Sequence, residues 1–128
     1  MANTVTVDGL AAEMTRLMRE YTDDVTEGVS REVDNTAKAV CNAVKAGAPK
    51  DSGKYAAGWG VTKRGTRENP KRIVWNKKYP GLPHLLEFGH AKVGGGRVSG
   101  RAHIRPAYEA HGAQLPEHIA RIIQRGGG

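Results

Sequence analysis

The sequence predicts an α+β fold: a long N-terminal helix, a small antiparallel β-sheet and a C-terminal helix, in one domain that covers residues 1–128. Three observations predict it. Apolar residues recur every three or four positions along residues 8–46, as they do on one face of a helix. In two short stretches, around Trp59 and Trp75, apolar and polar residues alternate as they do in β-strands. Helical spacing then returns over residues 106–125.

The N-terminal helix is expected to cover residues 8–46, after a flexible lead of residues 1–7. Asp8 can cap its start, and the sequence Gly-Ala-Pro at residues 47–49 ends it. Thirty-nine residues of helix would extend roughly 58 Å, whereas a compact chain of this size is only about 36 Å across. We therefore expect the helix either to break near Gly28 or to pack its apolar stripe on another subunit.

A small sheet with basic loops is expected within residues 55–105. The stretches 55–63 and 71–76 alternate as strands and should pair as an antiparallel hairpin, with Trp59 and Val61 on one face of the first strand. Ile73 and Trp75 should share a face of the second. The residues between the two strands are polar and basic and would form the hairpin tip.

Residues 84–89 are expected to form one helical turn, with Leu85, Leu86 and Phe88 partly buried. Four glycines make residues 91–102 a mobile loop in this reading.

A C-terminal helix is then expected over residues 106–125. Pro106 suits its first position, because the first turn needs no backbone N–H. Pro116 should kink or split this helix.

The charge of the chain is unevenly distributed. The formal net charge is +7, yet the first 34 residues are predominantly acidic and the remainder is strongly basic. Such asymmetry favours either a surface that faces nucleic acid or complementary packing between copies. Cys41 is the only cysteine, so no internal disulfide is possible. No signal peptide and no membrane span are expected, and the chain should act in a cytosol or in a particle assembled there.

No catalytic, cofactor-binding or metal-binding residue is predicted. The segment at residues 47–54 resembles a phosphate-binding loop, but its glycine spacing is wrong and Tyr55 stands where Ser or Thr is required. The five histidines lack metal-ligand spacing. Cys41 is interpreted as a small buried thiol, and Glu87 as a carboxylate that pairs with an arginine such as Arg105.

Basic residues cluster on the predicted hairpin and on the glycine-rich loop. They could contact DNA phosphates without sequence preference, or acidic protein surfaces such as the N-terminal helix of a neighbouring copy. The residues are Lys63, Arg64, Arg67, Lys71, Arg72, Lys77, Lys78, Lys92, Arg97 and Arg101.

Four segments in order carry a family resemblance: a long charged helix, APKDSGKYAAGW, a hairpin that ends in IVWN with YPGLPHLLEFGHA after it, and a glycine-rich basic loop before HIRPA. Over about residues 8–125 the chain resembles the family of small tail-component proteins (neck or tail-completion proteins) of HK-type, lambda-like long-tailed bacteriophages. The resemblance gives fold or interface roles to the residues that match these segments. They are Pro49, Asp51, Gly53, Leu86, Glu87, Gly89, Arg105 and Pro106.

The resemblance implies a non-enzymatic structural protein of the virion that joins head and tail and is assembled in the bacterial cytoplasm. It would act as a homo-oligomeric ring, with six copies expected, around the DNA channel. Its partners would be other neck and tail proteins, such as a tail terminator, a head-completion protein or an adaptor, and the packaged DNA. It needs no cofactor and no membrane.

Two other functions remain open from the sequence. A nonspecific DNA-binding protein would use the basic hairpin. A small hydrolase or nuclease would require that His84, His90 and His103 converge with Glu87.

Overall fold

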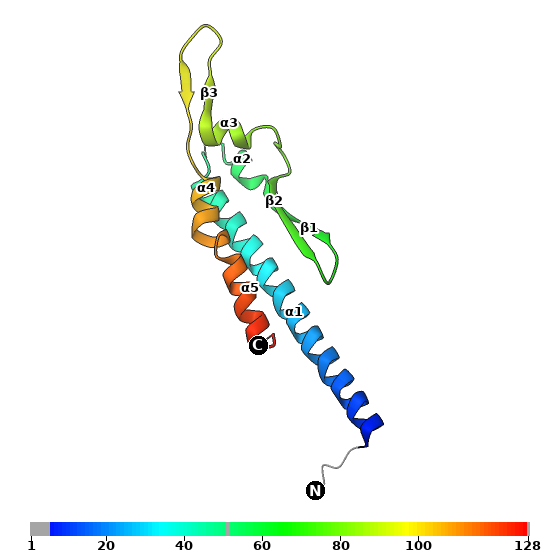
Figure 1. Cartoon of the computed structure of the whole chain (residues 1–128). Helices are drawn as coiled ribbons and strands as arrows, with labels where there is room; N and C mark the ends of the chain where they lie inside the picture. Colours follow the sequence, from blue (N-terminus) through cyan, green and yellow to red (C-terminus); the bar gives the residue numbers. More distant parts are fainter. Residues whose placement is uncertain (1–5, 51, 128) are drawn as a thin grey trace.

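The computed structural model describes residues 6–50 and 52–127. It confirms the predicted α+β fold, with two two-stranded antiparallel sheets instead of one. Figure 1 shows an elongated molecule with α1 as its spine. The elements are α1 (Val7–Gly47), α2 (Lys54–Ala57), β1 (Trp59–Gly65), β2 (Pro70–Asn76), α3 (Pro83–Phe88), β3 (Gly89–Ala91), β4 (Arg97–Ser99), α4 (Ile104–Ala107), the π-helix η1 (Tyr108–Gly112) and α5 (Leu115–Gln124).

Helix α1 is a single unbroken helix of 41 residues, about 62 Å long. Its N-cap is Thr6, not Asp8 as predicted, because the Thr6 hydroxyl accepts a hydrogen bond of 3.0 Å from the Gly9 amide. The predicted break near Gly28 is wrong. A Cβ atom at Gly28 would lie 2.9 Å from both the Gly127 carbonyl oxygen and Ile122 Cγ2, so this glycine admits the C-terminal segment against α1 and leaves the helix intact.

The other elements surround only part of α1 (Figure 1). Helix α5 lies beside the middle of α1, the β1–β2 hairpin lies along another side, and the β3–β4 hairpin projects beyond the C-terminal end of α1. The first turns of α1 extend past all of them. Among the described residues, Tyr21 is the most N-terminal one with a hydrogen bond to another element, from its hydroxyl to the Ile123 carbonyl at 2.8 Å. The preceding stretch of α1 therefore stands alone.

The predicted hairpin is confirmed, with a different start. Tyr55 lies in the short helix α2, and β1 begins at Trp59. The reason is Gly53, the N-cap of α2, whose φ of 76° lets the chain turn into this short helix between α1 and β1. Strands β1 and β2 then pair in register from Trp59 opposite Asn76 to Gly65 opposite Pro70.

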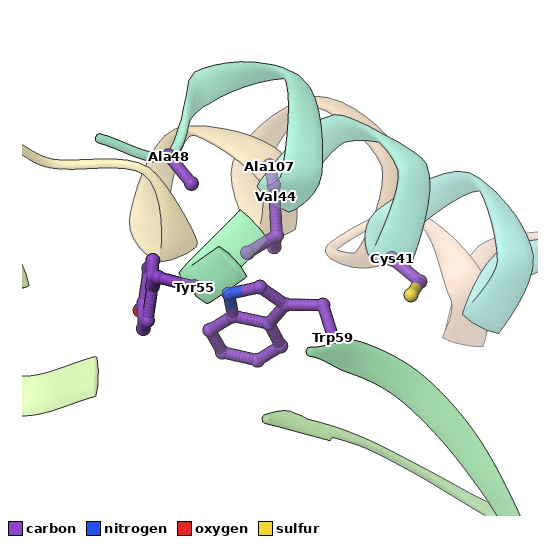
Figure 2. Close-up of a cluster of buried hydrophobic side chains, with 6 residues drawn as sticks. All are labelled: Cys41, Val44, Ala48, Tyr55, Trp59 and Ala107. Carbon is purple, nitrogen blue, oxygen red and sulfur yellow. The ribbon is translucent and has the colours of Figure 1, made fainter. Parts of the chain in front are cut away.

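The core lies where α1, α2, β1 and α4 meet. Its buried cluster, shown in Figure 2, consists of Cys41, Val44, Ala48, Tyr55, Trp59 and Ala107. The Tyr55 and Trp59 rings meet edge to face, with centroids 6.1 Å apart, a favourable aromatic geometry. Cys41 is a small buried thiol in this cluster, as predicted.

The C-terminal helix differs from the prediction in two ways. It begins at Ile104, and Pro106 lies inside its first turn, where a missing N–H costs nothing. It is also divided into α4, η1 and α5. The split before Pro116 was predicted and is confirmed: α5 begins at Leu115, so the proline occupies its first turn.

The glycine-rich stretch 91–102 is not simply a loop. Residues 97–99 form β4, which pairs with β3 from Gly89 opposite Ser99 to Ala91 opposite Arg97. The turn between them uses three glycines with positive φ, Gly94, Gly95 and Gly96. Sequence reasoning missed this hairpin because each strand has only three residues.

Candidate assembly interface

A buried carboxylate joins α3 to the start of α4. Glu87 Oε1 accepts hydrogen bonds from the backbone amides of His103 (2.7 Å) and Ile104 (2.9 Å), and Oε2 accepts one from the amide of Arg105 (3.0 Å). Burial raises the pKa of the Glu87 carboxyl, but these three amide hydrogen bonds outweigh it and hold the pKa below its usual range. The carboxylate therefore satisfies three of the N–H groups that a helix start leaves without partners.

His103 continues this cluster toward the core. Its Nδ1 atom lies 2.8 Å from the Arg101 carbonyl oxygen and 3.1 Å from Glu87 Oε1. Its Nε2 atom lies 2.7 Å from the Tyr55 hydroxyl. A carbonyl can only accept, so Nδ1 carries a proton and donates to it; in the tautomer with its single proton on Nδ1, the Tyr55 hydroxyl donates to Nε2. Burial in turn raises the pKa of Tyr55.

Two predictions about this region are wrong. Glu87 does not pair with an arginine side chain, because its oxygens are occupied by backbone amides; the Arg105 guanidinium binds Glu109 instead, at 3.1 Å. Phe88 is not partly buried: it is 68% exposed, whereas Glu87 next to it is buried. The Glu87 carboxylate points inward because the backbone amides at the start of α4 have no partner within their own helix. Phe88, the next residue along α3, consequently points outward.

The other residues of the predicted interface set have structural positions. Gly53 and Gly89 both have positive φ, and a Cβ atom on Gly89 would collide with the Val98 carbonyl oxygen across the β3–β4 pair. Leu86 packs against the core cluster. Pro49 is half-buried beside the end of α1. Asp51 lies outside the described residues.

The structure divides the ten predicted basic residues between two hairpins. Those on or beside β1–β2 do not form one exposed surface, because Arg72 turns toward α1. Its guanidinium binds the Asp34 carboxylate, and the two side chains are only 10% and 28% exposed. This hydrogen bond lowers the pKa of Asp34. Arg67 at the hairpin tip also reaches α1, where it lies 3.4 Å from Asp23.

The acidic helix thus binds basic hairpin residues of its own chain. Lys63, Arg64, Lys71 and Lys78 of this group remain exposed, and the Lys77 ammonium donates to the Val61 carbonyl.

The second basic group belongs to the β3–β4 hairpin and the residues after it. Arg97 donates to the Phe88 carbonyl at 2.8 Å, and Arg101 donates to the Gly47 carbonyl at 3.1 Å. Both side chains therefore brace the projecting hairpin against its base, and Lys92 is exposed near its tip. In Figure 1 the two hairpins point in different directions from the end of α1, so they present separate basic surfaces.

Apolar side chains are exposed on the free stretch of α1 and at Tyr21, where that stretch ends. We call this set the N-terminal seam, and it comprises Val7, Leu10, Met14, Leu17 and Tyr21. Its steps of three, four, three and four residues are those of a helix that packs on a partner, and Leu10, Met14 and Leu17 are each about half exposed (48–55%). The sequence-based expectation concerned the whole apolar stripe of α1. Its C-terminal part, with Val33, Ala37 and Val44, is buried within the chain, so packing on another subunit stays a prediction for this seam.

A second exposed apolar set lies on β1–β2. The strand register places Trp59, Val61 and Val74 on the inner face toward α1, and Ile73 and Trp75 on the opposite face, 46% and 38% exposed. Sequence reasoning placed Ile73 and Trp75 on one face but did not identify it as the outer one. Pairing Val61 with Val74 in an antiparallel register would have indicated it.

The chemical alternatives find little support in the geometry. Glu87 and His103 meet, but both are buried and occupied by structural hydrogen bonds, and His84 is exposed. Within residues 6–50 and 52–127, no group of three or more His, Cys, Asp or Glu side chains could hold a metal ion. In the same part of the chain, no helix combines the length and apolar character needed to cross a membrane.

Comparison with known proteins gives one match. Residues 12–89, more than half of the chain, match the model of the family described as "Bacteriophage HK97-gp10, putative tail-component". The matched stretch runs from α1 through both strands of the first hairpin to the end of α3, and it includes Glu87. No curated protein and no solved structure matches. The chain therefore belongs to the HK97-gp10 family of bacteriophage tail components, structural proteins of the virion.

Proposed function

We propose that this tail component joins the head and tail of the phage particle, as one copy of a closed ring of six around the DNA channel. The observation that carries the proposal is the N-terminal seam. Five apolar residues lie exposed along about 22 Å of helix, and among the described residues only the last of them, Tyr21, forms a hydrogen bond with another element of its own chain. An exposed apolar row of this length needs a protein partner to remove it from water.

The shape of the molecule supports a joining role. The free stretch of α1 and the β3–β4 hairpin project from opposite ends of the body. The core between them is fixed by buried groups, among them Glu87 and His103. A rigid body with two projecting ends can bind a different neighbour at each end, such as another copy, a tail terminator or a head-side adaptor.

Burial of apolar surface and charge pairing are sufficient for this function, and no reaction is needed. In the ring, the exposed residues Lys78 and Lys92 are candidates to face the DNA channel, where they would contact phosphates without reading the base sequence.

Nonspecific DNA binding by the free protein is the second candidate, favoured by the exposed lysines and arginines on both hairpins. It predicts an affinity for duplex DNA that falls steeply with salt while the protein stays monomeric. The binding of Arg72 and Arg67 to acids of α1 reduces the charge available for it.

A null mutant of the phage tests the proposal. We expect cells infected with it to accumulate DNA-filled heads and complete tails that remain unjoined, and we expect extract containing the purified protein to restore infectious particles. Normal joined particles without this chain would refute the proposal.

A further inference from the structure

The N-terminal seam has charged flanks that restrict its partner. Over residues 7–27, α1 carries six acidic residues against two arginines. Glu13 and Glu20 lie one position before the seam residues Met14 and Tyr21, and so border it on one side. Both also bind Arg16 of the same helix, at 2.5 and 3.2 Å, but these ion pairs are exposed to solvent and the stretch stays acidic. The partner surface should therefore be apolar in the middle, basic at its margins and about as long as the seam.

Such a surface exists on the chain itself. We call it the outer hairpin face, and it comprises Thr62, Arg64, Lys71, Ile73 and Trp75. It holds the two exposed apolar side chains of β1–β2, it ends in two bases, and no acidic residue occurs at its strand positions. The Trp75 indole is held in place by a 2.8 Å hydrogen bond to the Thr62 hydroxyl.

The hairpin is long enough to lie along the seam. Each strand has seven residues, about 23 Å in length, of which Lys71 to Trp75 on the outer face span about 13 Å; the seam extends about 22 Å along its helix. The β3–β4 hairpin is also basic, but its strands have only three residues each and cannot cover the seam.

The outer hairpin face cannot be reached by the seam of the same chain. The inner face of the hairpin already packs on α1, so the outer face points away from it. The seam lies at the far end of a straight helix (Figure 1).

Pairing of two seams with each other is disfavoured. If two seams packed antiparallel, Glu13 and Glu20 of one helix would face Glu20 and Glu13 of the other, and the like charges would repel. If they packed parallel, these glutamates would face no basic residue of the second helix.

We propose that the N-terminal seam of one copy packs on the outer hairpin face of the next copy. The hairpin is then enclosed between its own α1 and that of its neighbour, with Glu13 and Glu20 near Arg64 and Lys71. The two surfaces are different, so the contact is heterologous and propagates from copy to copy until it closes. This inference rests on the proposed ring and names the surfaces that build it.

A double cysteine variant tests the contact. Leu17→Cys and Ile73→Cys place one thiol on each surface, and the only native cysteine, Cys41, is buried. Particles assembled from wild-type chain together with this variant are treated with a short bismaleimide and separated under denaturing conditions. We expect covalently linked dimers and higher species.

The matched control is Ala12→Cys with Ile73→Cys, because Ala12 is on the opposite side of α1 from Leu17. It should yield at least tenfold less linked product, and neither Leu17→Cys nor Ile73→Cys alone should yield any. Particles that contain the chain but give equal products from the test and control variants would overturn the contact while leaving the joining function intact. Particles that lack the chain would instead overturn the function.

Charge reversal gives an independent measurement. Glu13→Lys with Glu20→Lys, or Arg64→Glu with Lys71→Glu, should each lower the number of joined particles at least tenfold. All four changes together should restore most of it. Failure of the combined variant to exceed either pair, with all three variants folded, would overturn the contact.

Discussion

Glu87 Oε1 and the backbone amide of His103 are joined by a buried hydrogen bond of 2.7 Å. Together with the amides of Ile104 and Arg105, this bond ties the last turn of α3 to the first turn of α4. The LLEFGH and HIRPA segments, which are 16 residues apart at the contact between Glu87 and His103, therefore form a single structural unit.

Removal of this carboxylate should destabilise the protein. We expect Glu87→Ala to cost about 3 kcal/mol or more in the free energy of unfolding, because three amides lose their acceptor in a buried site. Glu87→Gln, which keeps one acceptor oxygen, should cost less. Urea unfolding followed by circular dichroism measures both, and an alanine variant within about 0.5 kcal/mol of wild type would contradict this role for Glu87.

The same carboxylate predicts a pH dependence. Its pKa is depressed in the folded state, so its contribution to stability is present above the ordinary glutamate pKa of about 4.3 and is lost as the pH falls through the folded-state value. A protonated glutamate resembles glutamine in shape and charge. The stability difference between wild type and Glu87→Gln should therefore shrink from pH 7 to pH 3; a difference that stays constant would contradict the assignment.

The two ion pairs that bind the first hairpin to α1 should differ in strength. Arg72→Ala should destabilise by about 1–3 kcal/mol, because it removes a charged hydrogen bond to the half-buried Asp34. Arg67→Ala is the matched control. Its pair with Asp23 is exposed on both sides, so its loss should cost under about 1 kcal/mol. If the two variants lost the same free energy of unfolding in denaturant, the prediction that the more buried ion pair contributes more would be wrong.

The N-terminal seam should matter for assembly and not for folding. Leu17→Ser changes an exposed side chain on the free stretch of α1. The variant's free energy of unfolding should therefore stay within about 0.5 kcal/mol of the wild-type value. Infectious particles should nevertheless fall at least tenfold in a complementation assay. Ala12→Ser on the opposite side of the helix is the control and should leave titres unchanged. A Leu17→Ser variant that complements fully would argue against a partner for the seam.

Periodic patterns predicted much of the fold. The spacing of apolar residues identified α1, although it could not decide between a break and a continuous helix at Gly28. That choice depends on Gly127 and Ile122, which pack against Gly28 from the other end of the chain. Likewise, alternation identified β1–β2, but the burial of Tyr55 in α2 depends on tertiary contacts with Trp59 and His103.

The candidate site was less predictable, because its chemistry depends on distant backbone groups. The sequence around Glu87 indicated an arginine partner, since the neighbourhood is basic. The amides at the start of α4 have no sequence signature, and they proved to be the partners. The sequence alone locates the basic residues along the chain, but their division between two hairpins, and the turning of Arg72 toward Asp34, follow only from the packing.

The central claim, a ring of this chain at the head–tail junction, is tested most directly by the density of intact particles in electron cryomicroscopy. We expect a closed ring of six copies between head and tail, in which α1 of each copy is enclosed by protein along the N-terminal seam. A single copy at the junction, or density for this chain elsewhere in the particle with the seam exposed to solvent, would contradict the account.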